Sequence, residues 1–321
     1  MNIFFYEAFS EEREAIQRCL AGTHIEVGFT PATIQEQGDR HPPAALISIR
    51  TQSILPLEWR DDLTGILSRS TGYDHLRTYL DGCGKSIPCG YLPLYCNRSV
   101  AEQAMMLWMA LLRKLPQQLA HFHRFRRDGL TGRECRGKVL LIVGVGHIGS
   151  EIAWIGQGLG MEVYGVDIEE KHNHVQYLAI NEGLALADII VCAMNLTEEN
   201  QGFFSYERLR AAKRGLIFVN VARGELSLAA GLLQLLKEGC LGGVAMDVFN
   251  HESELAVSLR EGLVSSDPEV QATLELANHP QAILTPHNAF NTREAVERKA
   301  SHSIEQIAHF LQHGYFLWPI P

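Results

Sequence analysis

The sequence lacks several features that mark whole classes of protein. Its seven cysteines include no CxxC pair, and an odd number without that spacing argues against a disulfide framework. Its longest purely apolar run, Ala104 to Leu112, has nine residues, well short of the ~20 that span a bilayer. No basic leader precedes an apolar core at the N-terminus, which argues against a signal peptide. These absences predict a cytoplasmic protein with no membrane partner.

Positive charge is also scarce. The chain has 28 Lys and Arg against 37 Asp and Glu, a formal net charge of -9, so we expect no nucleic-acid partner. The basic and aromatic segment 121–127 (HFHRFRR) is therefore interpreted as solvated surface. The pair His172 and His174 has no further ligand at helical or strand spacing, so we expect no metal site.

The chain has enough apolar sequence for two domains, since 46% of its 321 residues are hydrophobic. Short apolar runs alternate with helix-like segments, a rhythm that predicts parallel α/β architecture. The expected strands are 3–6, 25–29, 44–49 and 65–67, followed by 139–143, 163–166, 189–192, 216–221, 243–248 and 282–284. The expected helices include 99–114, 226–238 and 292–313.

The predicted fold class is α/β, with a doubly wound parallel (Rossmann) sheet inserted into a smaller flavodoxin-like α/β substrate domain. A capping-box spacing at Ser99–Glu102 begins a long helix that connects the two domains. The last helical segment follows the sixth strand of the second sheet, so we expect it to return to the first domain. The expected domains are 1–103 with 288–321, and 104–287 between them.

The most informative segment is 138–167 (KVLLIVGVGHIGSEIAWIGQGLGMEVYGVD). An apolar strand leads into a glycine turn and an amphipathic helix. A second apolar strand follows and leads to Asp167, which comes 18 residues after Gly149, the last glycine of the turn. That order is the dinucleotide-binding fingerprint in its full context. The residues predicted to bind the dinucleotide in this segment are Gly144, Gly146, His147, Ile148, Gly149 and Asp167.

Charge decides which dinucleotide is expected. Asp167 should accept hydrogen bonds from the adenosine ribose hydroxyls, and Glu169 and Glu170 lie just beyond it. A 2′-phosphate would meet this acidic cluster, and one like-charge contact at ~4 Å costs about 4 kcal/mol at an effective dielectric of 20. No Arg or Lys follows before Lys171, so the predicted cofactor is NAD.

Three polar residues of distinct chemistry follow successive strands of the second domain, where an open parallel sheet places its ligands. They are Arg223, Glu252 and His287, in the segments NVARG, DVFNHE and TPH. An arginine can hold a planar carboxylate and polarise a carbonyl with paired donors. A histidine exchanges protons near neutral pH, and a neighbouring carboxylate orients it and favours its charged form. Hydride transfer to a 2-keto acid needs these three types.

The order of fingerprint, NVARG, DVFxxE and TPH resembles the D-isomer-specific 2-hydroxyacid dehydrogenases over nearly the whole chain. The resemblance implies that Arg223 binds and polarises the substrate, and that His287 is the general acid/base, paired with Glu252. It implies NAD-dependent reduction of a small 2-keto acid to the D-2-hydroxy acid, and the reverse, in a cleft between the domains. It also implies a homodimer through the cofactor domain.

Further positions carry the same resemblance. The segment 69–74 (RSTGYD) is similar to the family's turn whose backbone N–H groups grip the substrate carboxylate, here those of Thr71 and Gly72. Tyr95 and Phe290 match substrate-side aromatic residues of the D-lactate dehydrogenase branch. Additional cofactor contacts are implied at Asn195, Ala222 and Asp247.

The chain departs from the family pattern at several positions. Ser253 follows Glu252 where the family often has proline, and a long segment separates Glu252 from His287, as in the D-lactate dehydrogenase branch. Thr71 stands where phosphite-oxidising relatives carry lysine, which argues against that activity.

Two alternatives stay open. One is a reductase for glyoxylate, hydroxypyruvate or a phosphorylated 2-hydroxy acid on the same scaffold, favoured if Arg50 or Arg98 reaches a second anionic group. The other is a non-catalytic, NADH-sensing binding protein of the corepressor kind, which shares this fold. Retention of Arg223, Glu252 and His287 argues against the second alternative.

Overall fold

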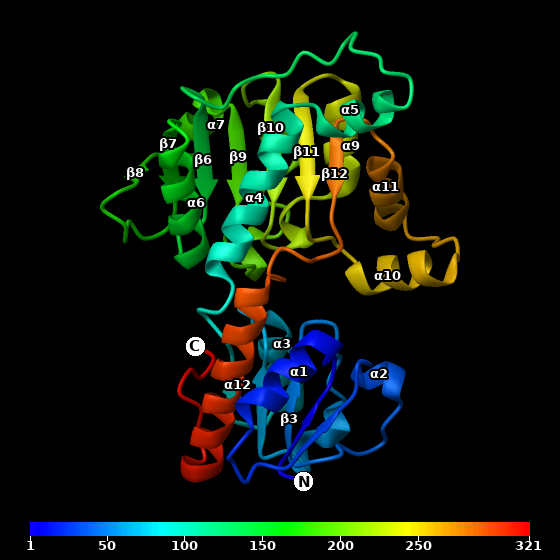
Figure 1. Ribbon diagram of the computed structural model, residues 1–321, viewed down its shortest axis with the longest axis vertical. Coiled ribbons are helices and arrows are strands. Elements are labelled where there is room, and N and C mark those ends of the chain that lie inside the picture. Colours follow the sequence, from blue (N-terminus) through cyan, green and yellow to red (C-terminus); the bar gives the residue numbers. More distant parts are fainter. The chain divides into compact units, whose positions relative to one another are not determined.

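The computed structural model describes all 321 residues and divides them into two compact units (Figure 1). Unit 1 consists of Met1–Cys96 and Asn291–Pro321, and unit 2 consists of Asn97–Phe290. The predicted breaks, after 103 and 287, lie seven and three residues from these positions. The first break differs because the connector helix, α4 (Asn97–Leu112), belongs to unit 2 from its first turn.

Unit 1 is built on a five-stranded parallel sheet with the order β2-β1-β3-β4-β5. This is the strand order of flavodoxin-like folds, so the predicted class of the first domain is confirmed. The four predicted strands are present, and a fifth, of two residues, is too short to show a periodic pattern. The strands are β1 (Ile3–Phe5), β2 (Val27–Phe29), β3 (Leu46–Ile49), β4 (Gly65–Ser68) and β5 (Cys89–Gly90).

Helices pack on this sheet and bury its central strands. Every residue of β3 and β4 is buried, as expected for unbroken apolar runs in a parallel sheet. The first and last helices, α1 and α12, lie side by side, which joins the C-terminal segment to the N-terminal sheet (Figure 1). The helices are α1 (Ser10–Cys19), α2 (Ile34–Gln37), α3 (Asp74–Cys83) and α12 (Arg293–His313), with a 3-10 turn, η1, at Leu57–Asp61.

Unit 2 is built on a seven-stranded parallel sheet with the order β12-β11-β10-β9-β6-β7-β8. The chain winds outward in both directions from β6, so the predicted doubly wound Rossmann class is confirmed. Six of the strands were predicted, and the seventh, β8, is a two-residue edge strand. The strands are β6 (Val139–Val143), β7 (Glu162–Val166), β8 (Gln176–Tyr177), β9 (Ile189–Cys192), β10 (Leu216–Asn220), β11 (Leu241–Met246) and β12 (Ala282–Leu284).

Helices cover both faces of the unit 2 sheet (Figure 1). α4 packs beside α6 and against β10, whereas α9 packs against α11 and β11. Besides α4, the helices are α5 (Leu115–Phe122), α6 (His147–Gly158), α7 (Ile180–Leu186), α8 (Tyr206–Arg210), α9 (Ala229–Lys237), α10 (Glu252–Glu261) and α11 (Pro268–Ala277), with 3-10 turns η2 (Glu198–Asn200) and η3 (Gly224–Leu226). None of the helices is long and apolar enough to cross a bilayer.

The parallel arrangement places the carboxyl ends of the unit 2 strands along one edge of the sheet. The loops that leave the strands at this edge carry the residues singled out from the sequence. They begin at Gly144 after β6, Asp167 after β7, Val221 after β10, Asp247 after β11 and Thr285 after β12.

Candidate active site

The glycine turn between β6 and α6 is shaped by what each glycine approaches. Gly144 has a φ of 94°, and a Cβ on it would lie 2.4 Å from the backbone of Met194. A Cβ on Gly149 would lie 2.1 Å from the carbonyl oxygen of Gly144, so glycine allows the helix to start against the strand. A Cβ on Gly146 would meet nothing within 4 Å. The turn is therefore closed toward the protein and open beside Gly146, which fits a pyrophosphate at the N-terminus of α6.

The first helical residues of α6 complete this turn. His147 is exposed and Ile148 is partly buried. No side chain caps the N-terminus of the helix, so its first backbone N–H groups remain available to an anion.

The acidic residue after β7 lies next to the glycine turn. Asp167 Oδ2 accepts a hydrogen bond from the backbone N–H of Val145 at 2.5 Å, and its Oδ1 accepts one from Glu169 N–H at 3.3 Å. These bonds fix the carboxylate where the fingerprint places the ribose-binding acid. Lys171, the first basic residue after Asp167 in the sequence, pairs with Glu169 at 2.5 Å in the exposed loop beyond.

The predicted acid/base pair is formed within unit 2. His287 Nδ1 lies 2.9 Å from Glu252 Oε1 and 3.0 Å from its Oε2, and both side chains are less than a quarter exposed. A carboxylate only accepts hydrogen bonds, so Nδ1 carries a proton and Nε2 is the nitrogen left for a substrate. Glu252 begins α10, where the helix N-terminus favours its negative charge.

The backbone at both members of this pair is unusual. His287 has a φ of 49°, and His251, directly before Glu252, has a φ of 53°. Non-glycine residues rarely adopt this left-handed conformation, which costs of order 1–3 kcal/mol and persists only where the surroundings enforce it. The fold therefore commits free energy to the placement of this histidine and this carboxylate.

Asp247 enforces the conformation of the His287 loop. Its carboxylate is 1% exposed, and accepts hydrogen bonds from Thr285 Oγ1 at 2.5 Å, Asn288 N–H at 3.0 Å and Ala289 N–H at 2.8 Å. Burial raises the pKa of Asp247, while these donors oppose the rise. The sequence predicts a cofactor contact for Asp247 and gives no sign of these hydrogen bonds to the His287 loop. A contact with the cofactor stays a prediction.

The turn that presents Arg223 is built by its neighbours. Asn220, fully buried, donates to the Arg223 carbonyl at 2.8 Å and accepts from Ala222 N–H at 3.0 Å. A Cβ on Gly224 would lie 1.9 Å from the carbonyl carbon of Phe249, so only glycine permits this approach to the loop after β11. The Arg223 side chain is partly buried, and its Nη1 donates to the Ala222 carbonyl at 2.8 Å. The NVARG segment therefore holds the backbone and the guanidinium of Arg223 in a fixed position.

The remaining candidates of unit 2 are less constrained. Asn195 is exposed, and its carbonyl accepts a hydrogen bond from Asn200 Nδ2 at 2.7 Å. Ala222 and Phe290 are partly buried. Their predicted contacts with cofactor and substrate stay predictions.

Unit 1 contains the turn predicted to hold the substrate carboxylate. The Thr71 hydroxyl donates to the Leu92 carbonyl at 3.2 Å, and Ser70 Oγ donates to the Gly72 carbonyl at 2.6 Å. The backbone N–H groups of Thr71 and Gly72 find no acceptor within unit 1. Both residues are only partly buried, so a turn fixed by its side chains offers two neighbouring donors.

Tyr95 and Cys96 lie beside this turn. Tyr95 is 4% exposed, and burial, followed by the neighbouring Cys96, raises its pKa well above the usual value. The thiol of Cys96 is 3.3 Å from Thr71 Oγ1. Tyr95 therefore stays a neutral phenol, and its predicted contact with the substrate stays a prediction.

Arg98 and Arg50, the two arginines that could extend the substrate site, have different surroundings. Arg98 is exposed on α4 and pairs with Glu102 at 2.7 Å and Glu151 at 3.4 Å. These pairs leave Arg98 with acids of its own unit. Arg50 lies over the ring of Phe9 at 5.2 Å, and its charge influences the ionisation of Tyr95.

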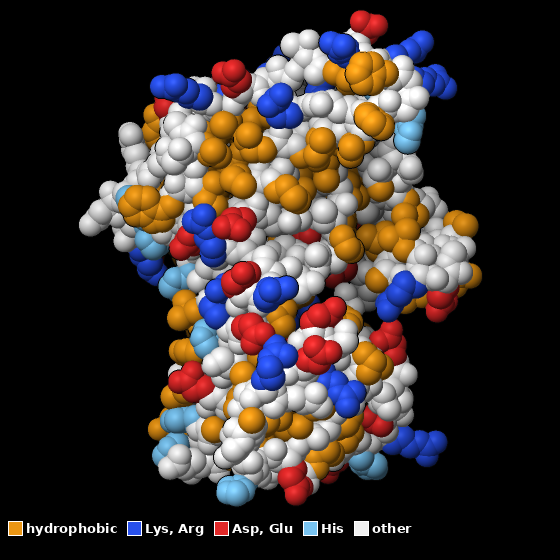
Figure 2. Space-filling view, viewed as in Figure 1, with side chains coloured by type: hydrophobic (Ala, Val, Ile, Leu, Met, Phe, Trp, Pro, Cys, Tyr) orange, Lys and Arg blue, Asp and Glu red, His pale blue; other side chains and the backbone are white.

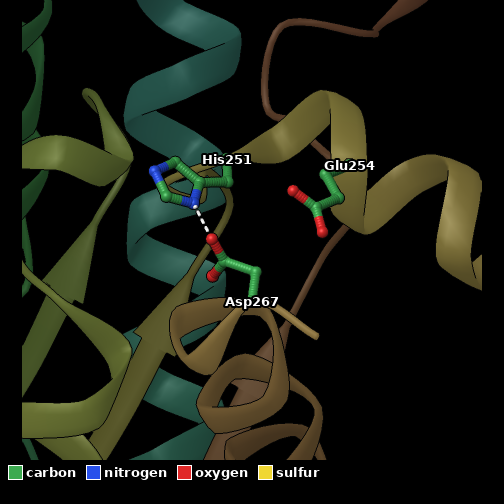
Figure 3. A group of neighbouring side chains, drawn as sticks. All are labelled: His251, Glu254 and Asp267. Carbon is green, nitrogen blue, oxygen red and sulfur yellow. Dashed lines mark hydrogen bonds and ion pairs between the residues drawn. The ribbon is translucent and has the colours of Figure 1, made fainter. Parts of the chain in front are cut away.

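One cluster outside the acid/base pair contains metal-ligating types. His251, Glu254 and Asp267 point toward one another from the start of α10 and the start of α11 (Figure 3). His251 Nδ1 is 2.7 Å from Asp267 Oδ2, while Asp267 Oδ1 caps α11 and Glu254 accepts from Ser265 Oγ at 2.5 Å. Each side chain thus has a partner in the protein. We interpret these side chains as structural contacts that hold the N-termini of α10 and α11 together near Glu252.

Known proteins share both the sequence pattern and the fold of this chain. The model of the D-isomer specific 2-hydroxyacid dehydrogenase NAD binding domain matches residues 105–289, more than half of the chain. The chain belongs to this family. The prediction made from the order of the motifs is thereby confirmed, and unit 2 is the family's NAD-binding domain.

Relatives of known activity differ in how much of their length they share with the chain. D-3-phosphoglycerate dehydrogenase of Haemophilus influenzae is 34% identical over 218 residues, which are 66% of this chain and 50% of that protein. D-lactate dehydrogenase of Streptococcus agalactiae is 27% identical over 98% of both chains. The chain thus spans half of the first relative and almost all of the second.

Solved structures share the fold over the whole chain. D-lactate dehydrogenase of Aquifex aeolicus, complexed with NAD and lactic acid, has a TM-score of 0.85, with 25% identity and coverage of 98% of this chain and 99% of that one. D-2-hydroxyisocaproate dehydrogenase has a TM-score of 0.84, with 22% identity and coverage of 100% and 99%. The second likeness shows the fold alone.

Proposed function

We propose that the protein is an NAD-dependent D-2-hydroxyacid dehydrogenase that reduces a small 2-keto acid to the D-2-hydroxy acid, and catalyses the reverse reaction. The observation that carries the proposal is the His287–Glu252 pair, at 2.9 Å, on the loops that follow β12 and β11. The pair lies in a unit whose glycine turn fits a dinucleotide. A proton donor and a hydride carrier are the two components that carbonyl reduction needs.

Each residue has a separate task in the proposed reaction. NADH, when bound, supplies the hydride that reaches the carbonyl carbon. His287 donates its Nε2 proton to the carbonyl oxygen, and Glu252 balances the charged imidazole before that transfer. Arg223 binds the substrate and stabilises the negative charge that develops on the oxygen. The N–H groups of Thr71 and Gly72 hold the substrate carboxylate.

The carboxylate of Asp167 supports NAD as the cofactor. It is held beside the glycine turn by Val145 N–H, and Glu169 and Glu170 follow it in an exposed loop. A 2′-phosphate in that place would face fixed negative charge, whereas ribose hydroxyls would find an acceptor. The D-lactate dehydrogenase of Aquifex aeolicus was solved with NAD.

A substrate and cofactor screen tests the proposal. NADH oxidation is measured with pyruvate, longer 2-keto acids, glyoxylate, hydroxypyruvate, oxaloacetate and 3-phosphohydroxypyruvate, and each is repeated with NADPH. We expect turnover of at least one unphosphorylated 2-keto acid, with kcat/KM at least tenfold lower for NADPH. Tight NADH binding without turnover of any compound would instead identify a non-catalytic NADH-binding protein.

We also propose that the protein is a homodimer through unit 2. Apolar side chains gather on the face of unit 2 that carries α4 (Figure 2). Leu119 and Phe122 of α5 are 63% and 70% exposed, and Met106 of α4 is 47% exposed. An exposed apolar surface of this kind is typical of an interface between subunits.

The dimer prediction is checked by the double substitution Leu119→Glu and Phe122→Glu. Charge on both side chains is expected to convert the protein to a monomer, because a buried, unpaired carboxylate opposes association. Light scattering coupled to size-exclusion chromatography gives the mass. The matched control, Leu259→Glu with Leu263→Glu on and after α10, replaces leucines that are 63% and 58% exposed and should keep the dimer. A wild-type monomer, or dimers in both variants, would refute the assigned surface.

A further inference from the structure

A group of buried charges lies in unit 1 behind the turn at 70–72. Arg69 and Lys299 share one carboxylate oxygen of Glu12, with Arg69 Nε 2.8 Å and Lys299 Nζ 2.9 Å from Oε1. The three side chains are 0%, 2% and 4% exposed, in the order Arg69, Lys299 and Glu12. They come from the loop after β4, from α12 and from α1. Three segments distant in the sequence therefore each place one charge at a single buried point.

This group contains more positive than negative charge. Two cations face one carboxylate, and the second oxygen of that carboxylate, Glu12 Oε2, is buried without a hydrogen bond. Buried charges are expensive to desolvate, and apolar side chains of similar volume often stabilise a core as well or better. Stability alone does not account for such an arrangement.

Its surroundings are the residues of unit 1 assigned to the substrate. Arg69 comes two residues before Thr71, and its Nη1 donates to Ser48 Oγ at 2.9 Å while its Nη2 donates to the Tyr6 carbonyl at 2.6 Å. These bonds fix the chain where it enters the turn. Lys299 Nζ lies 5.8 Å from the centre of the Tyr95 ring.

A second path connects Lys299 to the turn. Its charge influences the thiol of Cys96, and that sulfur is 3.3 Å from Thr71 Oγ1. The side chain of Lys299 is therefore behind the turn rather than in it. Lys299 does not contact a substrate at Thr71 and Gly72, but its field reaches that position, because charges in a protein interior are screened less than charges in water.

We propose that Lys299 is a positioning residue of the reaction: its buried ammonium keeps the region behind Thr71 and Gly72 positive, and thereby raises the affinity for the substrate carboxylate. The inference rests on the proposed function, because it assigns a cause to the binding of the 2-keto acid. It predicts an effect on KM rather than on kcat, since the carboxylate is negative in both the ground state and the transition state.

Charged and titratable groups face Lys299 from every segment packed around it. They are Glu12 on α1, Arg50 after β3, Arg69 after β4, Tyr95 and Cys96 before α4, and Arg298 on α12. Burial raises the pKa values of the phenol and the thiol, so both stay neutral. Burial would also raise the pKa of the Glu12 carboxyl, but the cations of Arg69, Lys299 and Arg50 outweigh it and lower this pKa to about 2.

Lys299 is then the member of this set that changes charge in a convenient pH range. Burial lowers its pKa to about 8, against the opposing charge of Glu12. In the unfolded chain the pKa lies near 10.5, so protonated Lys299 opposes folding below pH 8 and this penalty fades as the pH rises toward 10.5. Removing the charge at pH 7 should therefore not lower the melting temperature.

The test compares Lys299→Met with the wild-type protein in the 2-keto-acid assay between pH 7 and pH 9. Methionine keeps an unbranched side chain of nearly the same length and removes its charge. At pH 7 we expect KM for the 2-keto acid to rise about tenfold, with kcat within twofold and a melting temperature no lower than that of the wild type. As Lys299 loses its proton in the wild type, the ratio of the two KM values should fall toward one at pH 9.

Two further variants make the result specific. Lys299→Arg keeps a charge at every pH used, so its KM should match the wild type at pH 7 and remain low at pH 9. If Lys299→Met does not fold, this variant decides the question by the same comparison at pH 9. The matched control Lys85→Met removes an exposed lysine of unit 1, paired with Asp61 at 3.2 Å, and should change KM less than twofold.

Failure of the inference is distinct from failure of the proposed function. A KM ratio of one at pH 7, or a ratio independent of pH together with a lower melting temperature, would show that Lys299 is only structural. Contributions of His287 are present in both proteins and cancel in the ratio. If the wild-type protein reduces no 2-keto acid at all, the proposed function itself is refuted and the inference falls with it.

Discussion

Replacing His287 by alanine is expected to lower kcat/KM for the 2-keto acid by ~10²–10⁴-fold, the usual contribution of a positioned proton donor. The reason is that His287, whose Nδ1 lies 2.9 Å from Glu252, is the proposed proton donor, and an alanine side chain has no proton to donate. Steady-state NADH oxidation gives the kinetic constants. NADH affinity, followed by fluorescence, should change less than twofold, because the glycine turn and Asp167 follow β6 and β7, whereas His287 is on the loop after β12.

Two variants define what this loss means. Glu252→Gln should lower kcat/KM less than His287→Ala, because an amide oxygen can still accept from Nδ1–H but no longer balances the charged imidazole. His24→Ala removes an exposed histidine of unit 1 and should leave the kinetics unchanged. If 2-keto-acid reduction by His287→Ala stayed within tenfold of the wild type, the assignment of the proton donor would be wrong.

The fold was predictable because most of its strands are continuous apolar runs in the sequence. The runs at 139–143, 189–192 and 282–284 are apolar throughout, and the observed strands have the same bounds. The short strands β5 and β8 gave no such signal, because two residues have no period and their place is set by pairing with β4 and β7. The class of each sheet, flavodoxin-like in unit 1 and doubly wound in unit 2, followed from the βαβ rhythm and from the family resemblance.

Chemistry and spacing were enough to predict one contact of the candidate site. Glu252 and His287 were expected to pair, and they do, because each follows a strand at the same sheet edge. The clamp that Asp247 forms on the His287 loop was not foreseen. It depends on backbone N–H groups that point inward only once the loop is folded, and the sequence does not encode their direction.

The buried charges of unit 1 did leave a trace in the sequence. Ala295, Lys299 and Ser303 recur at steps of four residues on α12, which puts a lysine on the buried face of the helix. Glu12 likewise lies on the face of α1 that buries Ile16. A charged residue at a core position of an amphipathic helix requires a partner, but the sequence alone does not say which.

Substituting Arg223 by lysine is expected to lower kcat/KM by ~10²–10³-fold, although the charge is conserved. A guanidinium presents planar, paired donors, whereas an ammonium is a compact point charge that does not reproduce them. The rigid backbone around Arg223 strengthens this expectation. Asn220 and Gly224 fix its backbone, so a lysine in its place cannot recover the geometry by a shift of the loop. Kinetics with the substrate that the screen identifies provide the measurement.

The matched control for this prediction is Arg98→Lys. Arg98 is exposed and paired with Glu102 and Glu151, so the same chemical change should alter kcat/KM less than twofold. A large effect of Arg98→Lys on a phosphorylated 2-keto acid would instead show that Arg98 reaches a second anionic group of the substrate. Equal and small effects of both substitutions would mean that Arg223 contributes only charge, and the proposed polarisation of the carbonyl would have to be abandoned. A loss of kcat/KM confined to Arg223→Lys would show that paired hydrogen bonds from the guanidinium, and not its charge alone, stabilise the reacting carbonyl.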